Sequence, residues 1–212
     1  MAEQVTITNA SAEELQQQIA TLQRQLEERT DSLAQAQAAL GWLNLRFNTL
    51  QQLMHLFNED LSLAEALDQA LEVILSVSEC EAGSIFLLDE EKDELYFAAV
   101  RGPSAEQLKK VRLKRGEGIV GWAIEENETV AVSDVYRDAR FKREISESVG
   151  LEVNSVLCAP IRVRGVPIGA IEVLNKPHQE PFVADDSDLL NTAAHAVGLL
   201  IENLRLRGVG EE

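Results

Sequence analysis

The N-terminal part of the chain carries apolar residues at alternating intervals of four and three positions. The series runs from Leu15 to Met54 and is interrupted by a charged residue only at Arg29. Such a spacing places the apolar side chains on one narrow seam of an α-helix, as in a coiled coil. Forty helical residues rise about 60 Å, which is more than a small domain can cover. We therefore expect a coiled-coil helix over 11–57 that needs a partner helix.

The polar residues of this helix predict where it begins and which kind of helix it pairs with. Ser11 and Glu14 have the spacing of a capping box, so we expect the helix to begin there and 1–10 to be a flexible tail. Residues beside the seam are mostly uncharged, which favours a homodimer over pairing with a foreign helix, and Arg29 would fix register and strand number. The alternative is a long helix that folds back on its own globular domain.

After Asp60 the pattern becomes that of a mixed domain. Helical periodicity is found over 61–77, 118–126 and 185–207. Alternating or continuous apolar runs predict strands at 84–88, 94–100, 111–114, 129–132, 155–163 and 166–174. This order predicts an α+β fold, an antiparallel sheet with long helices on one face. We expect the domain to span 58–208, followed by a flexible tail over 209–212.

Charge and motifs exclude several classes of function. With 19 basic and 36 acidic residues the net charge is -17, which argues against binding to nucleic acid or to an anionic membrane. No apolar stretch suits a membrane span or a signal peptide, so we expect a soluble, cytoplasmic protein. Cys80 and Cys158 lie far apart, the histidines are scattered, and no catalytic motif is present. We therefore expect no enzymatic activity, no metal site and no required cofactor.

One glycine motif leaves two interpretations open. Gly116, Gly118 and Gly121 match the pattern GxGxxG, but the segment before them alternates with charges and is not a buried parallel strand. A dinucleotide site is therefore not expected. The glycines either form a modest anion site at the start of a helix or let that helix pack closely.

Four blocks of sequence together resemble a GAF domain. They are GIVGWA at 118–123, DVYRDARF at 134–141, SVLCAPI at 155–161 and IGAIEVLNK at 168–176. The resemblance covers about 60–207 and is closest to the GAF domains of cyclic-nucleotide phosphodiesterases and related cyclases. The signature residues of that group that match are Asn175, Lys176, Phe182 and Asp186, whereas Ser187 stands where the group has Glu.

The resemblance implies a six-stranded antiparallel sheet with helices on one face and a small-molecule pocket on the other. It also implies an ion pair between Lys176 and Asp186, and an anionic ligand such as cyclic AMP or cyclic GMP. The ligand-binding residues that it implies are Ser84, Arg101, Gly118, Ile119, Asp134, Tyr136, Asp138, Phe141 and Glu172. Backbone N–H groups at the helix start would hold a phosphate, and the two aromatic rings would enclose a base.

Glu172 is the most informative of these residues. It is the only ionisable residue between Ile168 and Leu174, in a segment that is otherwise apolar. A buried carboxylate is costly unless it finds a donor in protein, water or ligand. A salt bridge to a neighbouring arginine is the alternative to a ligand contact. A run of six basic residues over 101–115 would attract an anionic ligand, or it is simply a solvated face.

These observations leave three hypotheses. The first is a sensory GAF module that binds a small anionic ligand and signals through dimeric flanking helices to a downstream protein. The second is a dimerisation or scaffold module whose pocket is filled by its own side chains, such as Ile119, Tyr136 or Phe141. The third is redox or gas sensing, with Cys158 as the reactive group.

Overall fold

The computed structural model describes residues 2–103, 105–148 and 150–208, and the side chains of all of these except 2–13 and 58. The tail expected over 209–212 lies outside the described residues. The chain forms two compact units that meet between Asn44 and Leu45. The coiled coil expected over 11–57 and the domain expected over 58–208 stay predictions.

The first unit consists of the greater part of one long helix, α1 (Ala2–His55), whose last residues lie in the second unit. The backbone is already helical before Ser11, where we expected the helix to begin, and the side chain of Ser11 is outside the described part. Seam residues of this unit are largely exposed, with Leu15 at 58% and Leu26 at 67% of their accessible surface. The seam thus presents an exposed apolar stripe along the helix, interrupted by Arg29.

The end of α1 belongs to the second unit and has two apolar faces. Phe47 and Met54 continue the exposed seam, whereas Thr49 and Leu53 are fully buried. Leu53 packs in one core cluster with Leu56 of the following 3-10 helix η1 (Leu56–Asn58). Residues 45–57 are therefore part of the globular unit, because one side of this stretch, including the half-buried seam residue Leu50, packs against its core.

The sheet has six antiparallel strands, as expected from the resemblance. They are β1 (Ala82–Asp89), β2 (Glu94–Arg101), β3 (Arg112–Lys114), β4 (Val130–Val132), β5 (Val156–Val163) and β6 (Val166–Leu174). Their order across the sheet is β3-β2-β1-β6-β5-β4. The α+β fold predicted from the sequence is confirmed.

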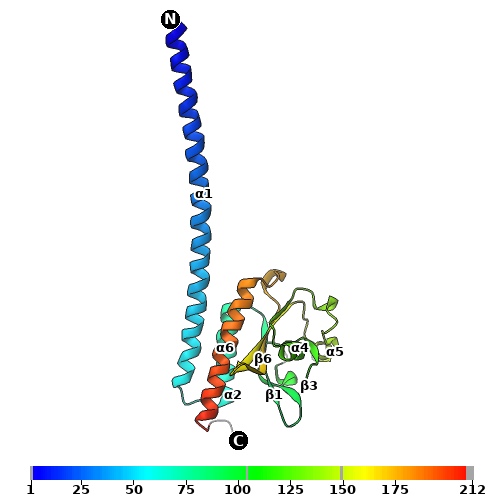
Figure 1. Ribbon diagram of the computed structural model, residues 1–212. Coiled ribbons are helices and arrows are strands. Elements are labelled where there is room, and N and C mark those ends of the chain that lie inside the picture. Colours follow the sequence, from blue (N-terminus) through cyan, green and yellow to red (C-terminus); the bar gives the residue numbers. More distant parts are fainter. Residues whose placement is uncertain (1, 104, 149, 209–212) are drawn as a thin grey trace. The chain divides into compact units, whose positions relative to one another are not determined.

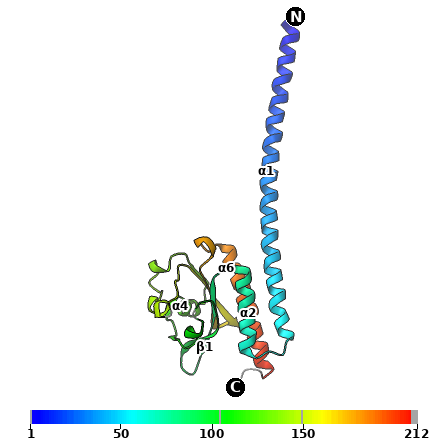
Figure 2. The ribbon, with the colours of Figure 1, turned by 180° about the vertical axis from the view of Figure 1, so that it is seen from behind.

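Helices cover the two faces of the sheet unequally (Figure 1; Figure 2). The long helices α2 (Leu63–Ser78) and α6 (Ala184–Leu206) pack side by side on one face and enclose the larger core cluster. The other face carries only short elements. These are α3 (Ala105–Leu108), α4 (Gly118–Glu126), η2 (Val135–Arg137) and α5 (Arg143–Ser148), while η3 (Pro177–Gln179) precedes α6.

The second core cluster lies under these short elements. Strand residues alternate between the two clusters, so that Ile85 and Leu87 face the long helices whereas Phe86 belongs to the second cluster. Short elements cover a sheet less completely than long helices do. This is the face on which a hollow remains.

Candidate ligand-binding cavity

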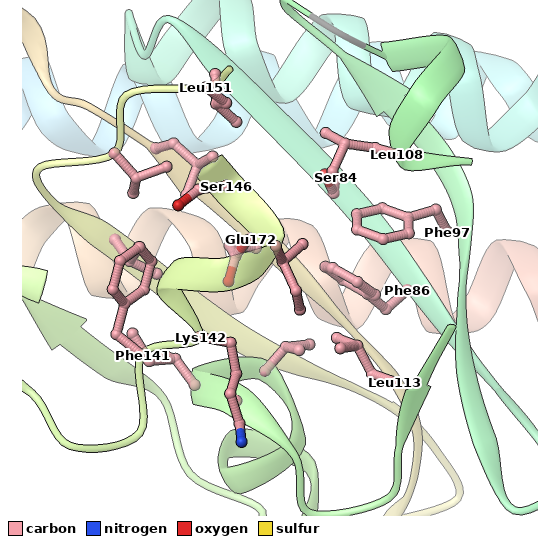
Figure 3. Close-up of a pocket in the computed structure, with 17 residues that line it drawn as sticks. Ser84, Phe86, Phe97, Leu108, Leu113, Phe141, Lys142, Ser146, Leu151 and Glu172 are labelled. Carbon is pink, nitrogen blue, oxygen red and sulfur yellow. The ribbon is translucent and has the colours of Figure 1, made fainter. Parts of the chain in front are cut away.

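A cavity of about 80 Å³ lies between the sheet and the short elements (Figure 3). The central strands β1 and β6 contribute Ser84, Phe86, Glu172 and Leu174. The segment 141–151, which includes α5 and is called the covering segment below, contributes Phe141, Lys142, Ile145, Ser146 and Leu151. The remaining lining residues are Phe97, Leu108, Leu113, Gly118, Ile119, Val120, Val153 and Val156. The cavity is therefore lined by strands on one side and by α3, α4 and the α5 segment on the other.

The size of the cavity limits what it holds without a rearrangement. Pockets for drug-sized ligands usually measure about 300 to 1,000 Å³, whereas about 80 Å³ has room for a few water molecules. A ligand as large as a nucleotide therefore requires the covering segment to move outward.

Glu172 lies at the centre of the strand side of the cavity. In the register of the sheet it stands opposite Ser84 of β1 and Cys158 of β5. No hydrogen bond or ion pair joins its carboxylate to another residue within the described ranges, so the arginine salt bridge considered above is not formed there. Burial raises the pKa of Glu172 to about 7. Its carboxyl group is thus a hydrogen-bonding partner that faces the cavity and is not used by the protein.

The rest of the cavity is mainly apolar. Phe86 and Phe97 form a tilted aromatic pair with their ring centroids 4.3 Å apart. The Ser84 hydroxyl lies on β1, and the Ser146 hydroxyl donates to the carbonyl oxygen of Arg143. Such a lining suits a flat, largely apolar group that carries N–H donors for the carboxyl group.

The start of α4 also lies at the cavity, as expected for Gly118 and Ile119. Glu117 precedes the helix and makes no side-chain capping bond; its carboxylate instead accepts from the backbone N–H of Lys114. A Cβ atom on Gly121 would meet the backbone of Gly116 at 2.5 Å. The glycine motif therefore lets α4 pack closely against its own preceding loop, which supports the packing interpretation and leaves the first N–H groups without a side-chain cap.

Four of the expected binding residues lie outside the cavity lining. Arg101 contacts α2, with its Nη2 atom 2.6 Å from Asp68 Oδ2 and 2.9 Å from Glu72 Oε2, and these carboxylates raise its pKa. Asp134 accepts from the backbone N–H of Tyr136 and so caps η2. Both side chains, those of Arg101 and Asp134, thus have hydrogen-bonding partners within the protein and do not need a ligand.

The other two are Asp138 and Tyr136. Asp138 forms an ion pair of 2.6 Å with Arg140, which lowers the pKa of Asp138. Tyr136 is half exposed, meets Phe141 edge-on at 5.9 Å and carries Arg143 over its ring. The two aromatic rings therefore do not enclose a slot for a base in this structure, although Phe141 itself lines the cavity.

Sequence reasoning missed several lining residues. Phe86 follows Ser84 by two positions on a strand, so the alternation of side chains could have placed it on the same face. Ile145 and Ser146 lie in the short helix α5, and Lys142 directly precedes it, but the sequence of this segment has no periodic signal. Their position over the sheet results from tertiary packing alone.

The described residues contain neither a metal-binding cluster nor a membrane-spanning helix. No group of three His, Cys, Asp or Glu side chains is arranged there so that it could hold a metal ion. No helix there combines the length and the hydropathy needed to cross a membrane.

Comparison with known families and proteins identifies relatives of the domain. The family model described as GAF domain matches residues 62–201. A probable 3',5'-cyclic phosphodiesterase of Caenorhabditis elegans is 24% identical over 160 residues, which are 71% of this chain and 22% of the relative. A dual 3',5'-cyclic-AMP and -GMP phosphodiesterase of Takifugu rubripes is 36% identical over 99 residues, 46% of this chain and 11% of the relative. The chain thus corresponds to less than a quarter of the length of these relatives.

Among solved structures, the GAF domain of a phosphoenolpyruvate-protein phosphotransferase from Coxiella burnetii superposes with a TM-score of 0.69. The match covers 77% of this chain and 96% of the other, at 24% sequence identity. At this identity the likeness establishes the shared fold.

Proposed function

Since the chain belongs to the GAF domain family, we propose that it is a regulatory module that binds a small ligand, and that this ligand is a cyclic nucleotide. The observation that carries the proposal is the Glu172 carboxyl group, which faces an apolar cavity and has no partner among the described residues. The relationship to phosphodiesterases that act on cyclic AMP and cyclic GMP supports this class of ligand. No cofactor is required in this scheme.

The base of the nucleotide would occupy the apolar part of the cavity. Ring and exocyclic N–H groups would donate to Glu172, with Ser84 beside it and Phe141 against the face of the base. Entry requires Phe141 and α5 to move away from the sheet, because a cavity of about 80 Å³ is too small for a nucleotide. Ligand binding therefore favours one arrangement of this segment over another, which is the condition for a signal.

The sheet and the helices are joined by contacts that would transmit the change. Arg101 at the end of β2 holds Asp68 and Glu72 of α2. On the other side, Arg46 near the end of α1 donates to the hydroxyl of Thr192 on α6 at 3.1 Å. A shift of the strands would thus alter the packing of α2 and α6 and reach the end of α1.

We further propose that α1 pairs with the same helix of a second copy. The exposed seam from Leu15 to Met54 supports a homodimer, because an apolar stripe of this length is unfavourable in water. A rotation of the paired helices would then be read by a downstream signalling protein. The cytoplasmic location and the absence of catalysis remain predictions.

Calorimetry and thermal unfolding with cyclic AMP and cyclic GMP test the ligand. We expect heat of binding and a higher melting temperature, because a ligand that binds the folded state stabilises it. At pH 8, where Glu172 is ionised, Glu172→Gln should weaken binding about tenfold, since a charged hydrogen bond becomes a neutral one. The exposed Glu180→Gln, with the same charge change, serves as the control. If neither nucleotide gives heat or a thermal shift, the ligand assignment is wrong.

The scaffold interpretation is the second candidate, because the cavity is small and Ile119 and Phe141 line it. It predicts an intact dimer that binds neither nucleotide. The redox interpretation is less well supported. Cys158 is fully buried, and burial together with the charge of Glu172 raises the pKa of its thiol, so the reactive thiolate is disfavoured.

A further inference from the structure

An open groove of about 510 Å³ lies directly beside the cavity. The two hollows share Gly118 and Lys142 as lining residues. The groove is otherwise lined by Lys114, Arg115, Gly116, Glu117, Trp122, Ala139 and Arg140. It is therefore adjacent to the site described above and differs from it in polarity.

The lining of the groove is basic within a strongly acidic chain. Four cationic side chains and one carboxylate, that of Glu117, line it, while the whole chain carries a net charge of -17. Arg140 is paired with Asp138, and its guanidinium lies over the ring of Trp122 at 4.3 Å. Arg115 lies 3.6 Å from Asp93, and Lys142 lies 3.6 Å from Glu117. Three of the four cations thus already face a carboxylate, and an anion on this side of the cavity would compete with these ion pairs.

Lys142 connects the two hollows. Its Cγ lies 3.9 Å from the position that a Cβ atom of Gly118 would take, so its aliphatic part borders the start of α4. Its ammonium group points away from Glu172 (Figure 3) and lies 3.6 Å from Glu117 Oε1, with 45% of the side chain exposed. An exposed ion pair of this length contributes little to stability, so a ligand anion can compete for the ammonium group.

The two ends of the site therefore differ in the kind of ligand group that they can bind. Glu172 at the inner end accepts hydrogen bonds, and Lys142 at the outer end offers a positive charge. An anionic group placed at the inner end would meet a carboxylate of like charge in apolar surroundings, which is unfavourable. An anionic group at the outer end meets cations and water.

We propose that the ligand spans both hollows, with its N–H donor end at Glu172 and its anionic end in the groove, and that Lys142 selects for the anionic group. The inference rests on the proposed function and adds to it the orientation of the ligand and a specificity-determining residue. The ligand class that fits is a base-containing phosphate, held with the base inward and the phosphate outward.

The test compares nucleotides with the corresponding nucleosides. Binding of cyclic AMP, cyclic GMP, adenosine and guanosine to the full chain is measured by calorimetry for the unchanged protein, Lys142→Gln, Lys142→Arg and Lys110→Gln. We expect Lys142→Gln to weaken cyclic-nucleotide binding about tenfold and nucleoside binding less than about twofold, since only the nucleotide carries the charge. Lys142→Arg should retain most of the nucleotide affinity. Lys110→Gln, an equal charge change at an exposed lysine outside the groove lining, should alter neither.

The outcomes separate the two proposals. If the unchanged protein binds cyclic nucleotides but Lys142→Gln leaves their affinity intact, or weakens nucleosides equally, the role of Lys142 is refuted while the proposed function stands. If the unchanged protein binds none of the four compounds, the proposed function fails and this inference fails with it. Melting temperatures of the variants show whether each is folded.

Discussion

Lys176 at the end of β6 and Asp186 in the first turn of α6 form an ion pair, with Lys176 Nζ 2.6 Å from Asp186 Oδ2. Both side chains are largely buried, and Asp186 Oδ2 also accepts from the backbone N–H of Val183 at the start of α6. The pair implied by the family resemblance is thus confirmed. The departure at Ser187 does not disturb it, because that hydroxyl donates to the carbonyl oxygen of Val183.

Removing one partner of this pair should destabilise the domain. Lys176→Met leaves a mostly buried carboxylate without its cation, which we expect to cost about 2 to 3 kcal/mol and to lower the melting temperature by about 4 to 10 °C. Lys92→Met, which breaks a more exposed ion pair of 3.0 Å with Asp89, is the matched control and should cost well under about 1 kcal/mol. Equal melting temperatures for the two variants would show that the pair contributes no more than a surface contact.

The raised pKa of Glu172 predicts a specific dependence of stability on pH. The ordinary value is 4.5 and the folded value is about 7, so between these the folded protein retains a proton that the unfolded chain has lost. Its contribution to the free energy of unfolding is therefore fully present below pH 4.5 and is lost as pH rises through 7. Between pH 5 and pH 8 the loss should be about 2 kcal/mol.

Urea unfolding at pH 5 and pH 8 measures this contribution. Glu172→Gln is neutral at both values and should lack this part of the pH dependence, so that the variant gains stability relative to the unchanged protein at pH 8. Glu180→Gln removes an exposed carboxylate instead and should follow the unchanged protein. A Glu172→Gln variant with an unaltered pH dependence would mean that Glu172 titrates normally in the folded state.

Much of the fold could be predicted because its signals are local. The seam spacing in α1 and the alternation in the strands depend on neighbours a few positions apart, and all six strands lie close to their expected ranges. The coiled-coil boundary could not be placed because two stripes overlap at the end of α1. Phe47 and Met54 extend the seam to residue 54, while Thr49 and Leu53 already face the globular core.

The candidate site was less predictable than the fold. Ser84, Gly118, Ile119, Phe141 and Glu172 line the cavity, and their role in ligand binding stays a prediction. Charged residues of the segment 134–141 form ion pairs with one another instead. Asp138 pairs with Arg140, and Asp134 pairs with Arg137. Sequence spacing cannot distinguish two charged residues that form such an ion pair from two that bind a ligand.

The boundary between the units can be tested by truncation. We expect the fragment 45–212 to melt at nearly the temperature of the globular unit in the full chain, whereas 58–212 lacks Thr49, Leu53 and Leu56 and should be much less stable. Leu53→Ala in the full chain should cost about 2 to 4 kcal/mol, because its side chain is fully buried. If 58–212 is as stable as 45–212, the end of α1 is not part of the core.

The seam predicts association that is independent of the stability of the globular unit. Leu26 is 67% exposed, so Leu26→Glu should leave the melting of the globular unit unchanged. In a paired coil the same change buries a charge in the seam, and we expect the dimer measured by light scattering to become monomeric. Arg29→Leu should act in the opposite direction, tightening association while loosening the specificity for two strands.

A substitution on the other side of the helix controls for the added charge. Gln17 lies off the seam, so Gln17→Glu should leave the dimer intact, although it changes the net charge by the same amount as Leu26→Glu. If the unchanged protein is monomeric at high concentration, or if both glutamate variants dissociate it equally, the apolar stripe is not the contact between copies. Dissociation by Leu26→Glu alone would place the contact on the seam, since both variants add one negative charge but only Leu26→Glu alters an apolar seam residue.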